Sequence, residues 1–166
     1  MVKLVTIDEK YIKYLSKFDS RVAVNKNQKR PYIGVLFEVR GHPYYAPLSS
    51  PKPKHTTMRN TEDFMRIAGG KYGAINFNNM IPVVLPAIHE IDISAATPIG
   101  YKMVLIHQIE FFNEKETEII NKATKLYKNY KSGKIRKEVK DRCCNFFVLE
   151  KKIGKYDPNY LPKPKV

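Results

Sequence analysis

The run Ser49-Ser50-Pro51-Lys52 brings two hydroxyl groups and one ammonium group close together. Displacement at a phosphate needs groups that exchange protons with the entering and departing oxygens, and positive charge beside the developing phosphorane. A loop that starts at a strand end can direct both serine hydroxyls, a backbone N–H and the Lys52 ammonium at one phosphate. Lys52 would supply the charge or the acid. The same run is also typical of an ordinary Ser-Pro turn beside a solvated lysine.

Further candidate groups lie near this run in the sequence. His55 has the intrinsic pKa of a general acid or base, although a loop histidine is usually solvated. Clustered cations should lower one another's pKa, which would bring Lys52 or Lys54 nearer to neutrality than the reference of about 10.4. A second set of residues could bind RNA, because it offers positive charge and an aromatic face on which unpaired bases could stack. The tyrosine in this set could equally be a core residue. This set is Lys26, Lys54, Tyr45, Arg59 and Lys71.

The overall charge favours a polyanionic partner. The chain has 30 Lys and Arg residues against 16 Asp and Glu residues, a net charge of +14. Such an excess spreads positive potential over the surface. Membrane headgroups are the main rival, but no stretch approaches the roughly 18 uninterrupted apolar residues of a spanning helix, and the N-terminus lacks the apolar block of a signal peptide. We therefore predict a cytoplasmic protein that binds nucleic acid and no membrane.

Cysteines and histidines give no sign of a metal site. The two cysteines, Cys143 and Cys144, are adjacent, which is typical of a buried pair in a reducing compartment rather than a disulfide framework. The four histidines lack the spacing of a zinc site on a helix. We predict no metal and no other cofactor.

The elements that must position these residues follow from hydrophobic periodicity. Strands are expected at 4–7, 31–39, 44–48, 74–77, 80–85 and 89–93, with 31–48 forming a hairpin. A helix should start near Asp8 and bury Tyr11, Ile12, Leu15 and Phe18. One kinked helix or a pair should follow 99, with a break near Asn113, and a last helix should cover 144–150.

This order predicts an α+β fold in a single compact domain, with a curved, mostly antiparallel β-sheet core flanked by helices. The domain should span residues 1–156, and the proline-rich residues 157–166 should form an extended or partly disordered tail. The loop at 49–57 cannot continue a central strand, because its prolines remove ladder donors.

An ordered set of short motifs runs along nearly the whole chain. The set contains 7–15, Pro31-Tyr32-Ile33-Gly34, 45–52 with its Ser49-Ser50-Pro51-Lys52, 76–82, Tyr101-Lys102 and 144–150. Any one of these tripeptides would mean little, but the set in this order is hard to obtain by chance. Together they resemble the ToxN/AbiQ family of bacterial type III toxins.

The resemblance implies a sequence-selective, metal-independent endoribonuclease with a fold similar to the MazF/Kid toxins. Such an enzyme cuts adenine-rich sites in cellular and phage RNA and leaves a 2′,3′-cyclic phosphate. Its antitoxin would be a repeated RNA pseudoknot that the toxin cuts from a precursor and that then holds the toxin in a closed protein-RNA assembly. A role in phage abortive infection is also implied.

The resemblance also assigns roles to individual residues. Ser50 and Lys52 correspond to a hydroxyl residue and a lysine that the family requires, and Ser49 keeps a hydroxyl found in a relative. A family lysine falls on Arg30, which can stabilise charge but cannot readily exchange a proton, so the proton-transfer role stays open. Lys29 and His55 remain further catalytic candidates. A noncatalytic basic RNA-binding module and a ribosome-associated structural protein remain alternatives.

Overall fold

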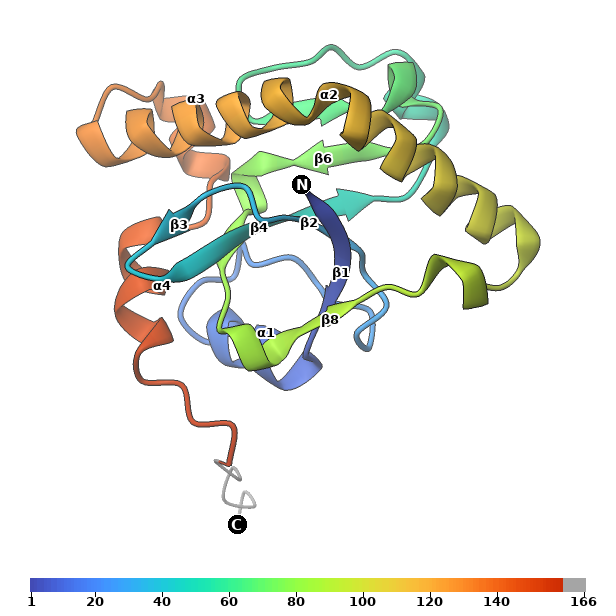
Figure 1. Ribbon diagram of the computed structural model, residues 1–166. Helices are drawn as coiled ribbons and strands as arrows, with labels where there is room; N and C mark the ends of the chain where they lie inside the picture. Colours follow the sequence, from blue (N-terminus) through green and yellow to red (C-terminus); the bar gives the residue numbers. More distant parts are fainter. Residues whose placement is uncertain (160–166) are drawn as a thin grey trace.

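Eight strands and four α-helices form residues 1–159, the part of the chain that the computed structural model describes (Figure 1). The strands are β1 (Lys3–Ile7), β2 (Tyr32–Gly34), β3 (Glu38–Val39), β4 (His42–Ser49), β5 (Phe64–Arg66), β6 (Ala74–Asn76), β7 (Ile81–Pro82) and β8 (Ile88–Glu90). The α-helices are α1 (Glu9–Ser16), α2 (Ile99–Ser132), α3 (Lys137–Arg142) and α4 (Phe146–Ile153). Short 3₁₀ helices are η1 (Pro53–Thr56), η2 (Ala68–Gly70), η3 (Phe77–Asn79), η4 (Leu85–Ala87) and η5 (Ile93–Ala95).

The strands form a sheet in the order β5-β6-β4-β2-β1-β8, with β3 and β7 also pairing with β4. Every pairing between these strands is antiparallel. Strand β4 is the centre of the sheet, and its residues from Pro43 to Leu48 are all buried. The predicted α+β class and antiparallel sheet are confirmed. The loop that begins at Ser50 therefore leaves from the buried central strand of the sheet.

The predicted hairpin is present as β3 and β4. Arg40 and Gly41 both have positive φ, 51° and 80°, as a two-residue turn whose twist matches the strands requires. The predicted strand over 31–39 is divided, however, into β2 and β3. Between them Leu36 N donates to Tyr44 O, so the chain bends without losing contact with β4.

The sequence predicted either one kinked helix or a pair of helices after residue 99, and α2 is one helix with a kink. Lys115 departs from helical geometry at φ −108° and ψ 16°, two residues after the predicted break. Its buried residues are spaced by three, four or seven positions, as one helix face requires, and include Leu105, Phe112 and Ile119. Figure 1 shows α2 crossing one side of the sheet beside β6, with α1 on the opposite side.

Buried carboxylates attach the C-terminal helices to the rest of the fold. Asp63 accepts two hydrogen bonds from Arg142, at 2.8 and 3.0 Å, and Asp19 accepts one from Asn145 N at 2.5 Å. Burial alone would raise the pKa of Asp63, but the Arg142 and Thr61 hydrogen bonds outweigh it and hold that pKa below its usual value.

Some elements differ from the sequence predictions. Helix α1 ends at Ser16, so Phe18 falls outside the buried stripe and is 38% exposed. The strand predicted at 80–85 shortens to β7, because a 3₁₀ helix starts at Leu85. The strand predicted at 89–93 begins one residue earlier, as β8, and ends at Glu90.

One strand and one α-helix were not predicted. Strand β5 is only three residues long and buries Met65 alone. Helix α3 buries only Val139 among charged neighbours, so neither element carries a periodic signal. The predicted tail falls mostly on residues 160–166, which lie outside the described residues. Within residues 1–159, no helix is long and apolar enough to cross a membrane.

Candidate functional site

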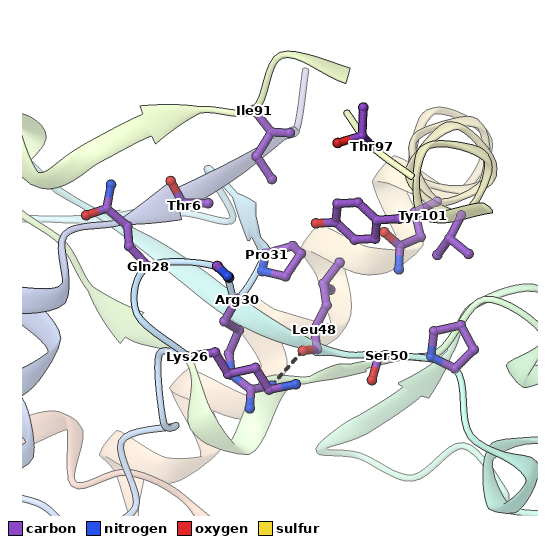
Figure 2. Close-up of a pocket in the computed structure, with 14 residues that line it drawn as sticks. Thr6, Lys26, Gln28, Arg30, Pro31, Leu48, Ser50, Ile91, Thr97 and Tyr101 are labelled. Carbon is purple, nitrogen blue, oxygen red and sulfur yellow. Dashed lines mark hydrogen bonds between the residues drawn. The ribbon is translucent and has the colours of Figure 1, made fainter. Parts of the chain in front are cut away.

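A pocket of about 570 Å³ lies beside the end of β4 (Figure 2). It is bounded by β1, the loop over 26–31, the start of the loop after β4, the segment over 91–97 and the first turns of α2. The pocket therefore gathers segments that lie far apart in the sequence around the predicted catalytic run.

The two serines of that run face different surroundings. Ser49 is the last residue of β4, and its Oγ accepts a hydrogen bond from Asn76 Nδ2 at 2.7 Å. Ser50 follows the strand, is exposed and lines the pocket. Successive side chains of a strand alternate in direction, which separates the two hydroxyls. Ser50 lines the pocket, whereas the Ser49 hydroxyl is held by Asn76 of β6.

The loop before β2 has an unusual backbone conformation. Lys26, Asn27 and Gln28 all have positive φ, at 53°, 55° and 66°. Such conformations cost roughly 1–2 kcal/mol per non-glycine residue, so other contacts must hold them. Asn25 supplies these contacts: its carbonyl accepts from Lys29 N and Arg30 N, and its Nδ2 donates to Ile7 O at 2.7 Å. Asn25 therefore holds this loop in a defined conformation.

Arg30 fastens this loop to the end of β4. Its Nε donates to Val24 O at 2.6 Å, and its Nη1 donates to Leu48 O at 2.8 Å, drawn as a dashed line in Figure 2. Because Ser50 lies two residues after Leu48, the guanidinium is held beside the pocket at the same end of the strand. This position suits a group that stabilises negative charge without moving a proton.

Lys26 and Arg30 both line the pocket, and the charge of Arg30 acts on the Lys26 amine. Partial burial lowers the pKa of Lys26, and the nearby charges of Arg30 and Lys52 lower it further. The sequence predicted such lowering from clustered cations, but for Lys52 or Lys54. The structure gives it to Lys26, which the sequence assigned to RNA binding.

His55 has a structural position in the loop after Lys52. It is only 2% exposed, and its Nδ1 accepts a hydrogen bond from Lys52 N at 3.2 Å. Burial, followed by the charges of Lys54 and Lys52, lowers its pKa, so the ring is neutral at neutral pH. The ring does not line the pocket, and it holds the backbone on which Lys52 sits.

The other predicted RNA-binding residues are dispersed. Tyr45 is buried, and its ring lies so close to Gly34 that a Cβ there would approach Cδ1 to 2.4 Å. A buried ring cannot stack on a base, so the structure removes Tyr45 from this set. Lys29 lines the pocket, whereas Lys54, Arg59 and Lys71 are exposed outside it.

One wall of the pocket contains none of the site residues predicted from the sequence. This wall consists of Ile91, Thr97, Tyr101, Val104 and Gln108, from the segment before α2 and its first turns. Tyr101, Val104 and Gln108 share one helix face, which periodicity alone interprets as core. A signal for function was the exposure of Tyr101, at 40%, which only the structure reveals.

The chain matches the family described as toxin ToxN of type III toxin-antitoxin systems over residues 3–154. An endoribonuclease ToxN from Bacillus thuringiensis subsp. kurstaki is 35% identical over 162 residues, which is 93% of this chain and 84% of the relative. A second endoribonuclease ToxN, from Pectobacterium atrosepticum, is 29% identical over 161 residues and covers 91% of each chain.

Solved structures agree with this match. A structure from work on selective toxin inhibition by a non-coding RNA pseudoknot superposes with a TM-score of 0.81 at 32% identity, over 95% of this chain and 99% of that chain. The structure of AbiQ, a lactococcal anti-phage endoribonuclease, superposes with a TM-score of 0.80 at 25% identity, over 94% and 98%. The chain therefore belongs to the ToxN/AbiQ family of endoribonuclease toxins of type III toxin-antitoxin systems.

Proposed function

We propose that this protein cleaves adenine-rich RNA without a metal ion, by attack of the 2′-hydroxyl on the adjacent phosphorus, and leaves a 2′,3′-cyclic phosphate. The observation that carries the proposal is the gathering of Lys26, Arg30 and Ser50 at one pocket, with the charge of Lys52 near enough to lower the pKa of Lys26. These groups supply a proton acceptor, fixed positive charge and a hydroxyl donor for one phosphate.

Each residue has a distinct part in the reaction. Lys26 takes the proton from the 2′-hydroxyl in the fraction of molecules whose amine is neutral, a fraction that its lowered pKa increases. The 2′-oxygen then bonds to phosphorus while the bond from phosphorus to the 5′-oxygen breaks, and the Lys52 ammonium protonates that oxygen. Arg30 stabilises the charge of the phosphorane, and the Ser50 hydroxyl donates to a phosphate oxygen. Ser49 and His55 hold the loop and are positioning residues.

The net charge of the protein and its family membership support a proposal for its antitoxin and its substrates. The net charge of +14 suits an RNA partner whose phosphates cover a large part of the surface. We propose that a repeated RNA pseudoknot is cut by this protein and then blocks the pocket in a closed protein-RNA assembly. Cellular and phage transcripts in the bacterial cytoplasm are the proposed substrates, with abortive phage infection as the outcome. The proposed domain is 1–156, with a likeness to MazF/Kid toxins.

The test compares wild type with Ser50→Ala on an adenine-rich RNA in excess EDTA, followed by chemical mapping of the new ends. Ser132→Ala is the matched control, because Ser132 is exposed at the far end of α2. We expect cleavage with cyclic phosphate ends by wild type and the control, and a loss of roughly 100-fold or more in Ser50→Ala. RNA binding without cleavage in all three proteins would instead favour the noncatalytic binding module.

A further inference from the structure

The pocket has two ends of different chemistry. Lys26, Arg30 and Ser50 form a polar, cationic end beside β4. At the other end, Ile91 and Val104 give apolar walls, and Tyr101 and Gln108 add an aromatic ring and an amide. A nucleotide has the same division, with a charged phosphate at one end and a flat, mostly apolar base at the other. The volume of about 570 Å³ lies in the range of small-ligand sites.

Gln108 has an acceptor without a partner. The residue is 3% exposed, and its Nε2 donates to Tyr72 O at 2.9 Å. This bond fixes the amide, because exchanging the two ends would place Oε1 against the Tyr72 carbonyl oxygen. Within residues 1–159, no hydrogen bond reaches Oε1. Buried polar atoms are nearly always paired, so an unpaired acceptor at a pocket wall points to a donor on a ligand.

Tyr101 provides the flat surface that a base needs. It lies seven residues before Gln108 on the same helix, so both side chains are on one face of α2. Its side chain is 40% exposed, and Figure 2 shows the ring reaching across the pocket toward Pro31. Unpaired RNA bases commonly stack on such exposed aromatic rings.

We propose that Tyr101 and Gln108 form a base-recognition subsite for adenine beside the scissile phosphate. Tyr101 stacks on the base, and Gln108 Oε1 accepts a hydrogen bond from the adenine N6 amino group. Guanine has a carbonyl oxygen at the equivalent position, which would face Oε1 as a second acceptor, and uracil likewise has a carbonyl at C4. This inference rests on the proposed ribonuclease function and names the residues that select its substrate.

The test uses single-cleavage-site RNA substrates that differ at one base next to the mapped cut. One substrate has adenosine there, and the other has purine riboside, which lacks only the N6 amino group. Wild type should cut the adenosine substrate roughly tenfold faster, the discrimination of one well-placed hydrogen bond. Gln108→Leu should cut both at rates within about twofold of each other. A purely structural role for Gln108 would lower both rates equally and keep the tenfold ratio.

A second variant keeps the proposal testable if Gln108→Leu does not fold. Tyr101→Ala removes the ring from an exposed position and should lower kcat/KM roughly tenfold or more on both substrates. Tyr101→Phe keeps the ring and should retain most of the wild-type kcat/KM. Equal cutting of adenosine and purine riboside by wild type, at each base flanking the cut, would overturn the subsite. Absence of cutting by wild type would overturn the proposed function instead.

Discussion

The two ends of β4 lead to two clusters of charge with opposite organisation. Near its start, Tyr44 donates to Glu150 at 2.7 Å, and that carboxylate also accepts from Tyr127 at 2.6 Å and Lys131 at 2.6 Å. Beyond its end, Lys26 and Arg30 meet without a carboxylate: among the salt bridges of residues 1–159, none involves either.

The charges around Glu150 are paired and stabilise the fold, whereas the unpaired charges of Lys26 and Arg30 are available to a ligand. Burial would raise the pKa of Glu150, but its three hydrogen-bond donors outweigh burial and lower it. At Lys26, burial and two neighbouring cations all lower the pKa, so the folded protein disfavours the charged amine. An anion such as a phosphate would relieve this repulsion. Unpaired like charges are thus a better mark of function than total charge.

The largest effect is expected from Lys26→Arg, which keeps the positive charge and removes the exchangeable proton. RNA cleavage should fall roughly 100-fold to 10,000-fold, the contribution of a general base, while RNA affinity stays within a few-fold of wild type. Single-turnover cleavage and filter binding measure the two quantities. Lys151→Arg, an exposed lysine on α4, is the matched control. Unchanged cleavage in Lys26→Arg would remove Lys26 from proton transfer.

Substitution of Glu150, in the cluster near the start of β4, should lower the stability of the fold and leave RNA cleavage by the folded protein unchanged. Glu150→Ala leaves Tyr44, Tyr127 and Lys131 without their common acceptor, and the free energy of unfolding should fall by roughly 1–3 kcal/mol. Urea denaturation measures this loss, and Glu118→Ala, an exposed carboxylate on α2, should change stability by less than about 0.5 kcal/mol. A loss of cleavage in Glu150→Ala that exceeds its unfolded fraction would show that the clusters are coupled.

Sequence reasoning reached the loop after β4 but only part of the pocket. The run at Ser49 to Lys52 was visible because Pro51 and the following Pro53 must end a strand, and the family resemblance directed attention to it. The positive φ angles at Lys26 to Gln28 were not predictable, because they depend on the contact between Asn25 and Ile7 O. Tyr101 belonged to a family motif, but neither Tyr101 nor Gln108 was predicted as a site residue, since helical spacing does not tell a core face from a pocket wall.

The smallest effects are expected in the pH dependence of stability, where the clusters have opposite signs. The lowered pKa of Glu150 means that its contribution is present above its unfolded value and is lost as pH falls through its folded pKa. The lowered pKa of the Lys26 amine means that its charge destabilises the fold at neutral pH, and that this penalty disappears as pH rises toward the unfolded value of 10.5.

Urea denaturation over a pH series tests both signs by comparing variants with wild type. Lys26→Met should be slightly more stable than wild type at pH 7, and this gain should vanish as pH approaches 10.5, where unfolded lysine also loses its charge. Glu150→Gln should be less stable at pH 7, and its deficit should shrink in acid. A Lys26→Met protein less stable than wild type at pH 7 would mean that Lys26 is paired in solution, and the contrast between the two ends of β4 would then fail.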